Sequence, residues 1–223
     1  RAKEVDADII LATDPDADRL GVVVKTTSGD YVPLTGNMTG MLIADYIISQ
    51  KQAAGTLPAN GVLIKTIVST NMAEAVADYY NIQLKEVLTG FKYIGEQIKL
   101  FEQNGDHTYL FGFEESYGCL IGTHARDKDA VVATMMVSEI AAFYKSKGMN
   151  LWDAMVSLYE KYGYYMEDLR SITLKGIDGI KKINYILDEL RNDVPHSFGP
   201  YSVVQVRDYK NNAVTDLATG KVK

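Results

Sequence analysis

Residues 61–118 read GVLIKTIVSTNMAEAVADYYNIQLKEVLTGFKYIGEQIKLFEQNGDHTYLFGFEESYG, and they carry the main information about fold class. Short runs rich in β-branched and aromatic residues alternate with segments whose apolar residues recur every three or four positions. The pattern predicts strands at 62–68, 83–87 and 108–113, and helices at 71–80 and 93–103. Alternation at this spacing favours parallel strands joined by right-handed crossovers.

The flanking segments continue the pattern. Upstream, residues 8–13 and 20–25 predict two strands joined by a tight loop, and residues 31–34 lead into a helix that ends near Gln50. Downstream, the pattern predicts helices at 129–147, 150–162 and 177–191, strands at 164–174 and 201–208, and a polar tail after Asn211 that frays. We therefore expect an α/β fold with a mixed, mainly parallel sheet and flanking helices.

Composition narrows the class of protein. The 223 residues are 47% hydrophobic and 23% charged with a net charge of −6, which excludes a disordered tail and a membrane bundle. No run of Lys or Arg could follow a phosphate backbone and no apolar stretch could span a bilayer, so we expect neither a nucleic-acid nor a membrane partner. Cys119 is the single cysteine, which favours a reducing, cytoplasmic location. Because the sequence begins with Arg1, we expect a piece of a longer protein.

An acidic loop is the strongest local signal. Asp14-Pro15-Asp16-Ala17-Asp18-Arg19 follows an apolar strand directly. Three carboxylates this close repel one another unless a cation or fixed donors compensate, and alternating aspartates offer oxygen ligands to Mg²⁺. A calcium EF-hand loop is excluded, because Arg19 and Lys25 stand where that loop needs glycine and glutamate. A solvated acidic turn is the remaining alternative.

Three further segments carry polar groups next to predicted element ends. Residues 112–118 (GFEESYG) and 89–92 (TGFK) follow strands, where the functional loops of parallel sheets lie. Residues 124–129 (HARDKD) precede a helix and could hold a phosphate through Arg126 and Lys128. Taken singly, each segment is equally compatible with an ordinary turn, loop or charged helix start.

Taken in order, the four segments resemble the α-D-phosphohexomutase superfamily, and specifically its bacterial phosphoglucomutase/phosphomannomutase members. In that family a D-x-D-x-D-R metal loop precedes a T-G-[W/F]-K segment, a G-[E/F]-E-E-S-[F/Y]-G sugar loop and an H-x-R-x-K-D run. The same order occurs here between Asp14 and Asp129. Pro15 and Ala17 replace glycines that are common in the metal loop, and Phe113 stands where many members carry another residue.

The resemblance implies an isomerase of carbohydrate metabolism that interconverts sugar 1-phosphates and 6-phosphates. The phosphoryl group would pass to and from a phosphoserine, with glucose 1,6-bisphosphate as intermediate or activator and a hexose phosphate as substrate. By resemblance, Mg²⁺ is held by Asp14, Asp16 and Asp18. Substrate and phosphate contacts are implied for Arg19, Thr89, Glu114, Ser116 and Lys128. Lys128 and His124 are the candidate catalytic groups.

The resemblance also implies missing parts. Residues 1–34 would be the end of domain 2 with the metal loop, residues 35–150 the sugar-binding domain 3, and residues 151–223 the remaining helices with a lead-out toward domain 4. Neither the family's T-x-S-H-N-P serine loop nor its R-x-S-G-T-E-P phosphate loop occurs here. Domains 1 and 4 of the same polypeptide are therefore expected partners, and the chain alone is expected to lack mutase activity.

Two other classes stay open at this point. In a haloacid dehalogenase-type phosphatase, Asp14 would be the nucleophile and Asp16 the acid/base, although Asp18 stands where that family usually has Thr or Val. A non-catalytic domain with a degenerate site is the other alternative. The sequence does not discriminate among glucose, mannose and pentose phosphates, and it does not determine the oligomeric state.

Overall fold

The computed structural model describes residues 1–167 and 173–222. The chain forms two compact units, Arg1–Glu167 and Asp168–Lys223. Among the described residues, none of the helices combines the length and the apolar character that a membrane crossing requires.

The first unit begins with a three-stranded antiparallel sheet of β1 (Ile9–Thr13), β2 (Leu20–Lys25) and β3 (Tyr31–Leu34). Thr13 pairs with Leu20, so the acidic loop is the turn of the β1–β2 hairpin. Helix α1 (Gly36–Ala53) follows, and the Thr35 side chain caps it by accepting a hydrogen bond from the Met38 N–H.

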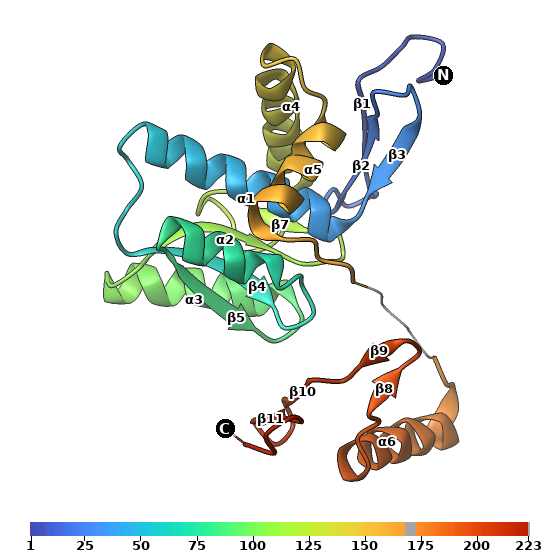
Figure 1. Cartoon of the computed structure of the whole chain (residues 1–223). Coiled ribbons are helices and arrows are strands. Elements are labelled where there is room, and N and C mark those ends of the chain that lie inside the picture. Colours follow the sequence, from blue (N-terminus) through green and yellow to red (C-terminus); the bar gives the residue numbers. More distant parts are fainter. Residues whose placement is uncertain (168–172, 223) are drawn as a thin grey trace. The chain divides into compact units, whose positions relative to one another are not determined.

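A four-stranded sheet forms the centre of this unit, with the strand order β5-β4-β6-β7. Strand β4 (Gly61–Thr66) is parallel to β5 (Gln83–Val87) and to β6 (Thr108–Phe113), and β7 (Cys119–Leu120) is antiparallel to β6. The crossovers are α2 (Met72–Tyr80) and α3 (Phe91–Asn104) (Figure 1). This arrangement confirms the predicted mixed, mainly parallel sheet and brings the loops after β4, β5 and β6 to one edge.

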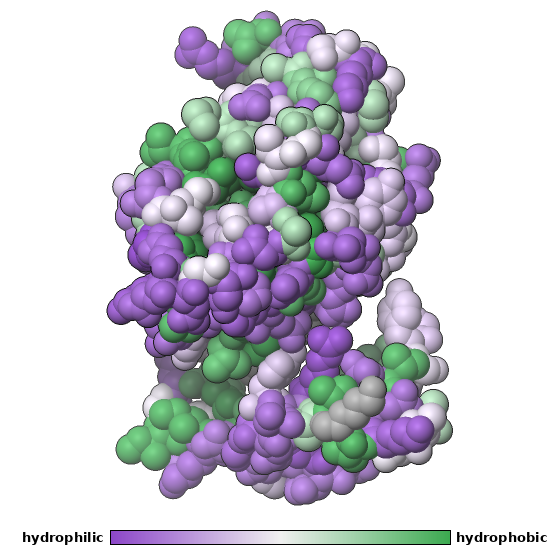
Figure 2. Space-filling model, turned by 90° about the vertical axis from the view of Figure 1, so that its left-hand side faces the viewer, coloured by the Kyte–Doolittle hydropathy of each residue, from purple (hydrophilic) through white to green (hydrophobic). Residues whose placement is uncertain are grey.

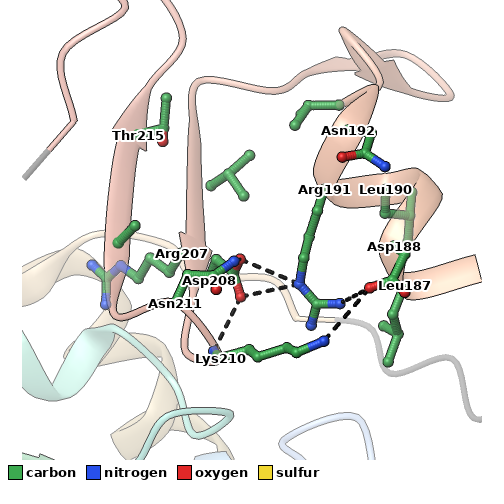
Figure 3. Close-up of a pocket in the computed structure, with 13 residues that line it drawn as sticks. Leu187, Asp188, Leu190, Arg191, Asn192, Arg207, Asp208, Lys210, Asn211 and Thr215 are labelled. Atoms are coloured by element: carbon green, nitrogen blue, oxygen red, sulfur yellow. Dashed lines mark hydrogen bonds and ion pairs between the residues drawn. The ribbon is translucent and has the colours of Figure 1, made fainter. Parts of the chain in front are cut away.

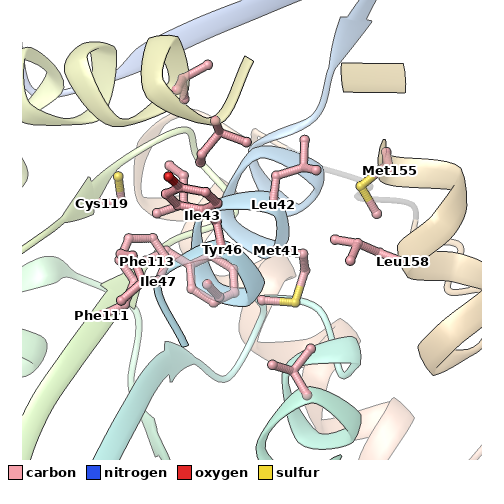
Figure 4. Close-up of a cluster of buried hydrophobic side chains, with 14 of the residues drawn as sticks. Met41, Leu42, Ile43, Tyr46, Ile47, Phe111, Phe113, Cys119, Met155 and Leu158 are labelled. Atoms are coloured by element: carbon pink, nitrogen blue, oxygen red, sulfur yellow. The ribbon is translucent and has the colours of Figure 1, made fainter. Parts of the chain in front are cut away.

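The two faces of this sheet are covered by different helices. Leu63 of β4 packs in a core with α1, α2, α4 (Ala130–Ser146) and α5 (Leu151–Tyr162), whereas its neighbours Val62 and Ile64 pack against α3. This alternation follows from the two-residue period of a strand. Figure 4 shows the larger cluster, in which Met41 and Ile47 of α1 lie among side chains of β6 and α5.

The second unit is small and has little interior. It contains α6 (Gly176–Asn192) and two hairpins, β8 (Ser197–Phe198) with β9 (Tyr201–Ser202), and β10 (Gln205–Asp208) with β11 (Ala213–Asp216). None of its described hydrophobic residues is buried. Figure 2 shows apolar areas between polar ones on one face of the molecule, and the exposed apolar side chains of this unit include Ile177, Ile180 and Phe198.

For the end of the chain, two predictions were wrong and a third was only partly right. Residues 164–167 and 173–174 form no strand, and residues 168–172 lie outside the described residues. The predicted strand 201–208 is split between two hairpins. The tail after Asn211 does not simply fray: β11 pairs with β10, because the Asp208 carboxylate accepts the Lys210 N–H at 3.1 Å and the Asn211 amide at 2.7 Å and so closes the turn.

Candidate functional site

The acidic loop is folded around its first carboxylate. Asp14 Oδ1 accepts the N–H groups of Asp18 at 3.1 Å and Arg19 at 3.0 Å. The Arg19 hydrogen bond is the main reason that the pKa of Asp14 lies below its ordinary value, so this carboxylate is ionised at neutral pH. Ala17 adopts a left-handed conformation with φ of 55°, which explains why glycine suits this position.

The three aspartates fit a hard cation. Asp14, Asp16 and Asp18 each offer a carboxylate oxygen, and these atoms lie within 4.8 Å of one another. Asp18 Oδ1 is buried and has no hydrogen-bond partner among the described residues, and the Arg19 Nε atom lies 3.9 Å from it. A buried carboxylate oxygen without a donor is costly unless a cation binds it. The donor set therefore suits Mg²⁺.

Lys128 connects the acidic loop to the loop after β6. Its Nζ atom lies 2.9 Å from Asp18 Oδ2 and 3.1 Å from Asp127 Oδ1. Its stem packs so closely on Gly118 that a Cβ there would lie 2.1 Å from Lys128 Cδ. Partial burial opposes the charge, but the hydrogen bonds to Asp18 and Asp127 prevail and raise the pKa of Lys128. Lys128 is thus a fixed cation between the two loops.

The loop after β6, residues 114–118, is joined to the acidic loop through the backbone. The Leu20 N–H donates to the Tyr117 carbonyl at 3.1 Å, and Arg19 and Gly118 form a β-bridge. Within the loop, the Glu114 N–H donates to the Gly118 carbonyl at 2.8 Å. Two segments more than 90 residues apart in sequence therefore form one edge of the site.

Glu114 and Ser116 differ in their surroundings. The Glu114 side chain is buried, and its Oε1 atom accepts the Gly90 N–H at 3.0 Å. Burial raises the pKa of Glu114 despite this hydrogen bond and the charge of Lys128. The half-buried Ser116 hydroxyl has no hydrogen-bond partner in the described part of the chain. The Gly90 contact brings the exposed Thr89 to the same loop cluster.

His124 and Arg126 each pair with a carboxylate outside the acidic loop. His124 Nε2 lies 2.9 Å from Asp129 Oδ2, and the other oxygen of Asp129 caps helix α4. The His124 hydrogen bond is the largest cause that lowers the pKa of Asp129. Arg126 pairs with Glu102 of α3 at 2.6 Å and also donates to loop carbonyls. Within the described residues neither side chain bonds to the acidic-loop carboxylates.

Sequence reasoning did not single out Lys65 and did not assign Glu115 a role of its own. Lys65 is fully buried in β4, and its Nζ atom lies 2.7 Å from Glu86 and 3.2 Å from Asn71. Glu115 accepts a hydrogen bond from Thr66 at 3.2 Å. A lysine in the middle of an apolar strand was the available signal for Lys65, whereas nothing in the sequence distinguished Glu115 from its neighbour.

Two hollows of the surface bear on the location of the site. One, of about 330 Å³, lies against the acidic loop and is lined by Thr13, Asp14, Arg19 and Tyr117, among others. A larger one of about 740 Å³ lies within the second unit (Figure 3). There Arg191 pairs with Asp208 at 3.2 Å and with Asp188 at 2.9 Å. The larger hollow contains none of the predicted site residues.

Comparisons with known proteins bear on the family to which the chain belongs. Residues 35–162 match the family model described as "Phosphoglucomutase/phosphomannomutase, alpha/beta/alpha domain III". A phosphoglucomutase of Staphylococcus epidermidis is 36% identical over 221 residues, which cover 99% of this chain and 39% of that protein. The chain thus spans about two fifths of the length of this relative.

Solved structures share the fold. The open form of Paramecium parafusin, a phosphoglucomutase, has a TM-score of 0.59 at 18% identity, covering 94% of this chain and 34% of that one. N-acetylphosphoglucosamine mutase of Aspergillus fumigatus, solved with GlcNAc-6P and magnesium, has a TM-score of 0.52 at 14% identity, covering 70% and 36%. Another structure of that mutase, with glucose 1,6-bisphosphate, has a TM-score of 0.50 at 16% identity, covering 68% and 32%.

The match of the family model to more than half of the chain, together with the α/β architecture over the same residues, gives one conclusion: this chain belongs to the phosphoglucomutase/phosphomannomutase family and contains its α/β/α domain III.

Proposed function

We propose that this chain is the central part of a phosphohexomutase that interconverts sugar 1-phosphates and 6-phosphates through a phosphoserine and a bisphosphorylated sugar. The observation that carries the proposal is the Lys128 bridge. It links the acidic loop, through Asp18, to the loop that bears Glu114 and Ser116. One loop cluster thus contains cation ligands, a fixed positive charge and groups able to bind sugar hydroxyls.

The acidic loop would hold the metal. Mg²⁺ bound by Asp14, Asp16 and Asp18 would neutralise charge on the transferring phosphoryl group. The half-exposed Arg19 side chain is available for a phosphate oxygen or for the phosphoserine. Division of the chain into the end of domain 2, domain 3 and a lead-out toward domain 4 remains part of this proposal.

Glu114 and Ser116 would bind the sugar ring, and Thr89 would add a contact beside them. A carboxylate accepts and a hydroxyl both accepts and donates, which suits two neighbouring ring hydroxyls. These hydroxyls are present in either orientation of a bisphosphorylated sugar, so one loop can serve both halves of the reaction.

Lys128 would act through its charge. The raised pKa keeps its ammonium protonated at neutral pH, which favours contact with a phosphate over proton abstraction. His124, paired with Asp129, is the alternative candidate for proton transfer.

The phosphoryl carrier would come from another part of the polypeptide. The serine-loop and phosphate-loop patterns are absent from this sequence, so we expect the chain to be inactive alone and to need domains 1 and 4. Glucose 1,6-bisphosphate is the proposed intermediate or activator, and a cytoplasmic location remains a prediction. One fold neighbour was solved with magnesium and another with glucose 1,6-bisphosphate, which supports these ligands for this chain.

A mutase assay tests the proposal. The complete polypeptide that contains this sequence should convert glucose 1-phosphate to glucose 6-phosphate in the presence of Mg²⁺, and the 223-residue chain should not. Ser116→Ala should raise KM, whereas Ser138→Ala on α4 should leave activity unchanged. Mutase turnover by the chain alone would contradict its expected inactivity. An acyl-phosphate formed on Asp14, or beryllofluoride bound there, would contradict the proposal and favour a phosphatase.

A further inference from the structure

The loop after β6 reaches the ends of β4 and β5, the next two strands on one side of β6 in the sheet, through two adjacent carboxylates. Glu114 accepts the Gly90 N–H, which follows β5, at 3.0 Å. Glu115 Oε2 accepts from the Thr66 hydroxyl at the end of β4 at 3.2 Å, and the Ser69 hydroxyl lies 3.5 Å from it. The carboxyl ends of β4, β5 and β6 are therefore connected through this loop.

The hydroxyls that face Glu115 lie inside the protein. Thr66 is fully buried, Ser69 is 4% exposed, and their oxygen atoms lie 2.8 Å apart. Buried hydroxyls need hydrogen-bond partners, and a carboxylate is the strongest acceptor available here. The Glu115 carboxylate is thus directed to the β4–α2 turn.

The backbone of Glu115 is held as firmly as its side chain. A Cβ at Gly36, the first residue of α1, would lie 2.1 Å from the Glu115 carbonyl oxygen. The next residue of that helix, Asn37, accepts the Thr70 N–H of the β4–α2 turn at 3.1 Å. The start of α1, the β4–α2 turn and the loop after β6 form one packed junction, and Glu115 lies in it.

We propose that Glu115 is a positioning residue that fixes the loop after β6 in the geometry at which Glu114 and Ser116 meet the sugar, without itself touching the sugar phosphate; for its effect on activity the inference rests on the proposed function. Ser116 has no side-chain partner within the described residues, and Glu114 carries a raised pKa. Glu115 is engaged with the turn. Of these three neighbouring residues, Glu114 and Ser116 therefore bind the ligand, and Glu115 places the loop.

The kinetic test uses the complete polypeptide. Glu115→Ala should raise KM for the sugar phosphate roughly tenfold or more with a smaller change in kcat, because misplaced binding groups weaken the ligand contacts. Glu115→Gln keeps an acceptor oxygen for Thr66 and should stay within about threefold of the wild type. Thr66→Val should also raise KM. The double variant Thr66→Val/Glu115→Ala should have a KM no higher than that of Glu115→Ala alone. Glu96→Ala, at an exposed position of α3, is the matched control.

A second readout needs no sugar phosphate. Amide hydrogen exchange of the Glu114 N–H, which donates to the Gly118 carbonyl, should be roughly tenfold faster in Glu115→Ala and nearly unchanged in Glu115→Gln. If the wild type shows no mutase activity but exchange responds in this way, the proposed function fails and the positioning role stands.

Two results would overturn the inference. One is unchanged KM and unchanged exchange in Glu115→Ala. The other is a Glu115→Gln variant whose KM rises as much as that of Glu115→Ala while its own amide exchange stays at the wild-type rate. That result would assign Glu115 to direct ligand contact. If Glu115→Ala does not fold, Glu115→Gln and Thr66→Val decide the question by the same two measurements.

Discussion

The Lys128 ammonium lies 2.9 Å from Asp18 Oδ2, whereas the other oxygen of the same carboxylate, Oδ1, is buried and has no hydrogen-bond partner in the described part of the chain. One oxygen of Asp18 thus pairs with the Lys128 ammonium, and the other oxygen is available to a metal ion. The helix that follows Lys128 is anchored to the same loop, because the Ala130 N–H donates to the Ala17 carbonyl at 3.0 Å.

Lys128→Met should tighten Mg²⁺ binding. Removing a positive charge beside three carboxylates increases their attraction for a divalent cation, by roughly three- to tenfold in affinity at low ionic strength and less at high salt. Calorimetric titration of the chain with Mg²⁺ measures the change. Lys92→Met, which removes a lysine that lies over the Tyr93 ring, should leave the affinity unchanged. Weaker binding by Lys128→Met would mean that Lys128 orients Asp18 for the metal.

Glu114→Gln should stabilise the chain at neutral pH. Burial raises the pKa of Glu114 above its ordinary value of 4.5, so the folded state holds the proton more tightly than the unfolded state does. The stability that the protonated Glu114 side chain contributes is fully present below the pKa of this group in the unfolded chain. It is lost as the pH rises through the higher pKa of Glu114 in the folded chain. Glutamine can still accept the Gly90 N–H without a buried charge. Thermal unfolding should show a higher Tm for Glu114→Gln at pH 7 and no advantage below about pH 4; a lower Tm at pH 7 would refute this.

Ala17→Gly should stabilise the acidic loop. Ala17 has φ of 55°, a conformation that costs an L-residue about 1–2 kcal/mol and costs glycine little. Glycine also gains entropy in the unfolded chain, which offsets part of this benefit, so we expect a net increase of about 0.5–1 kcal/mol in the free energy of unfolding. Urea titration measures it, and Ala17→Val should change stability in the opposite direction because of its branched side chain. A destabilised glycine variant would show that the loop is not strained.

Gly36→Ala should destabilise the chain although alanine is the better helix former. The new Cβ would lie 2.1 Å from the Glu115 carbonyl oxygen, a backbone atom that cannot rotate away. Overpacking of this kind costs about 1–3 kcal/mol, which exceeds the gain of about 1 kcal/mol in helix propensity. Urea unfolding at pH 7 gives the sign, and a more stable variant would show that the junction around Glu115 is loosely packed.

The sequence allowed prediction of the central sheet because local and long-range preferences agree there. Val62, Leu63 and Ile64 are β-branched or apolar and are buried on both faces, as a central parallel strand requires. Prediction failed for β11 and its pairing with β10, where a polar segment is closed into a hairpin by the Asp208 side chain rather than by an apolar pattern.

The candidate site was predictable in its residues and not in its contacts. The aspartates and Ser116 can be recognised as candidates from their residue type and from their position after predicted strands. Lys128 meets Asp18 across 110 residues of chain, and no local pattern encodes such a pairing. The roles of Glu114 and Glu115 also depend on whether each carboxylate reaches the end of β5 or the end of β4, and this is fixed by the sheet order β5-β4-β6.

A residue-resolved NMR titration of this chain with Mg²⁺, and then with glucose 1,6-bisphosphate, shows whether the acidic loop and the loop after β6 form one site. Our expectation is that Mg²⁺ shifts the amide signals of residues 14–19 and that the bisphosphate then shifts those of residues 89–90 and 114–116. Shifts confined to residues 14–19 after both additions, or bisphosphate shifts only around Arg191 in the second unit, would contradict it.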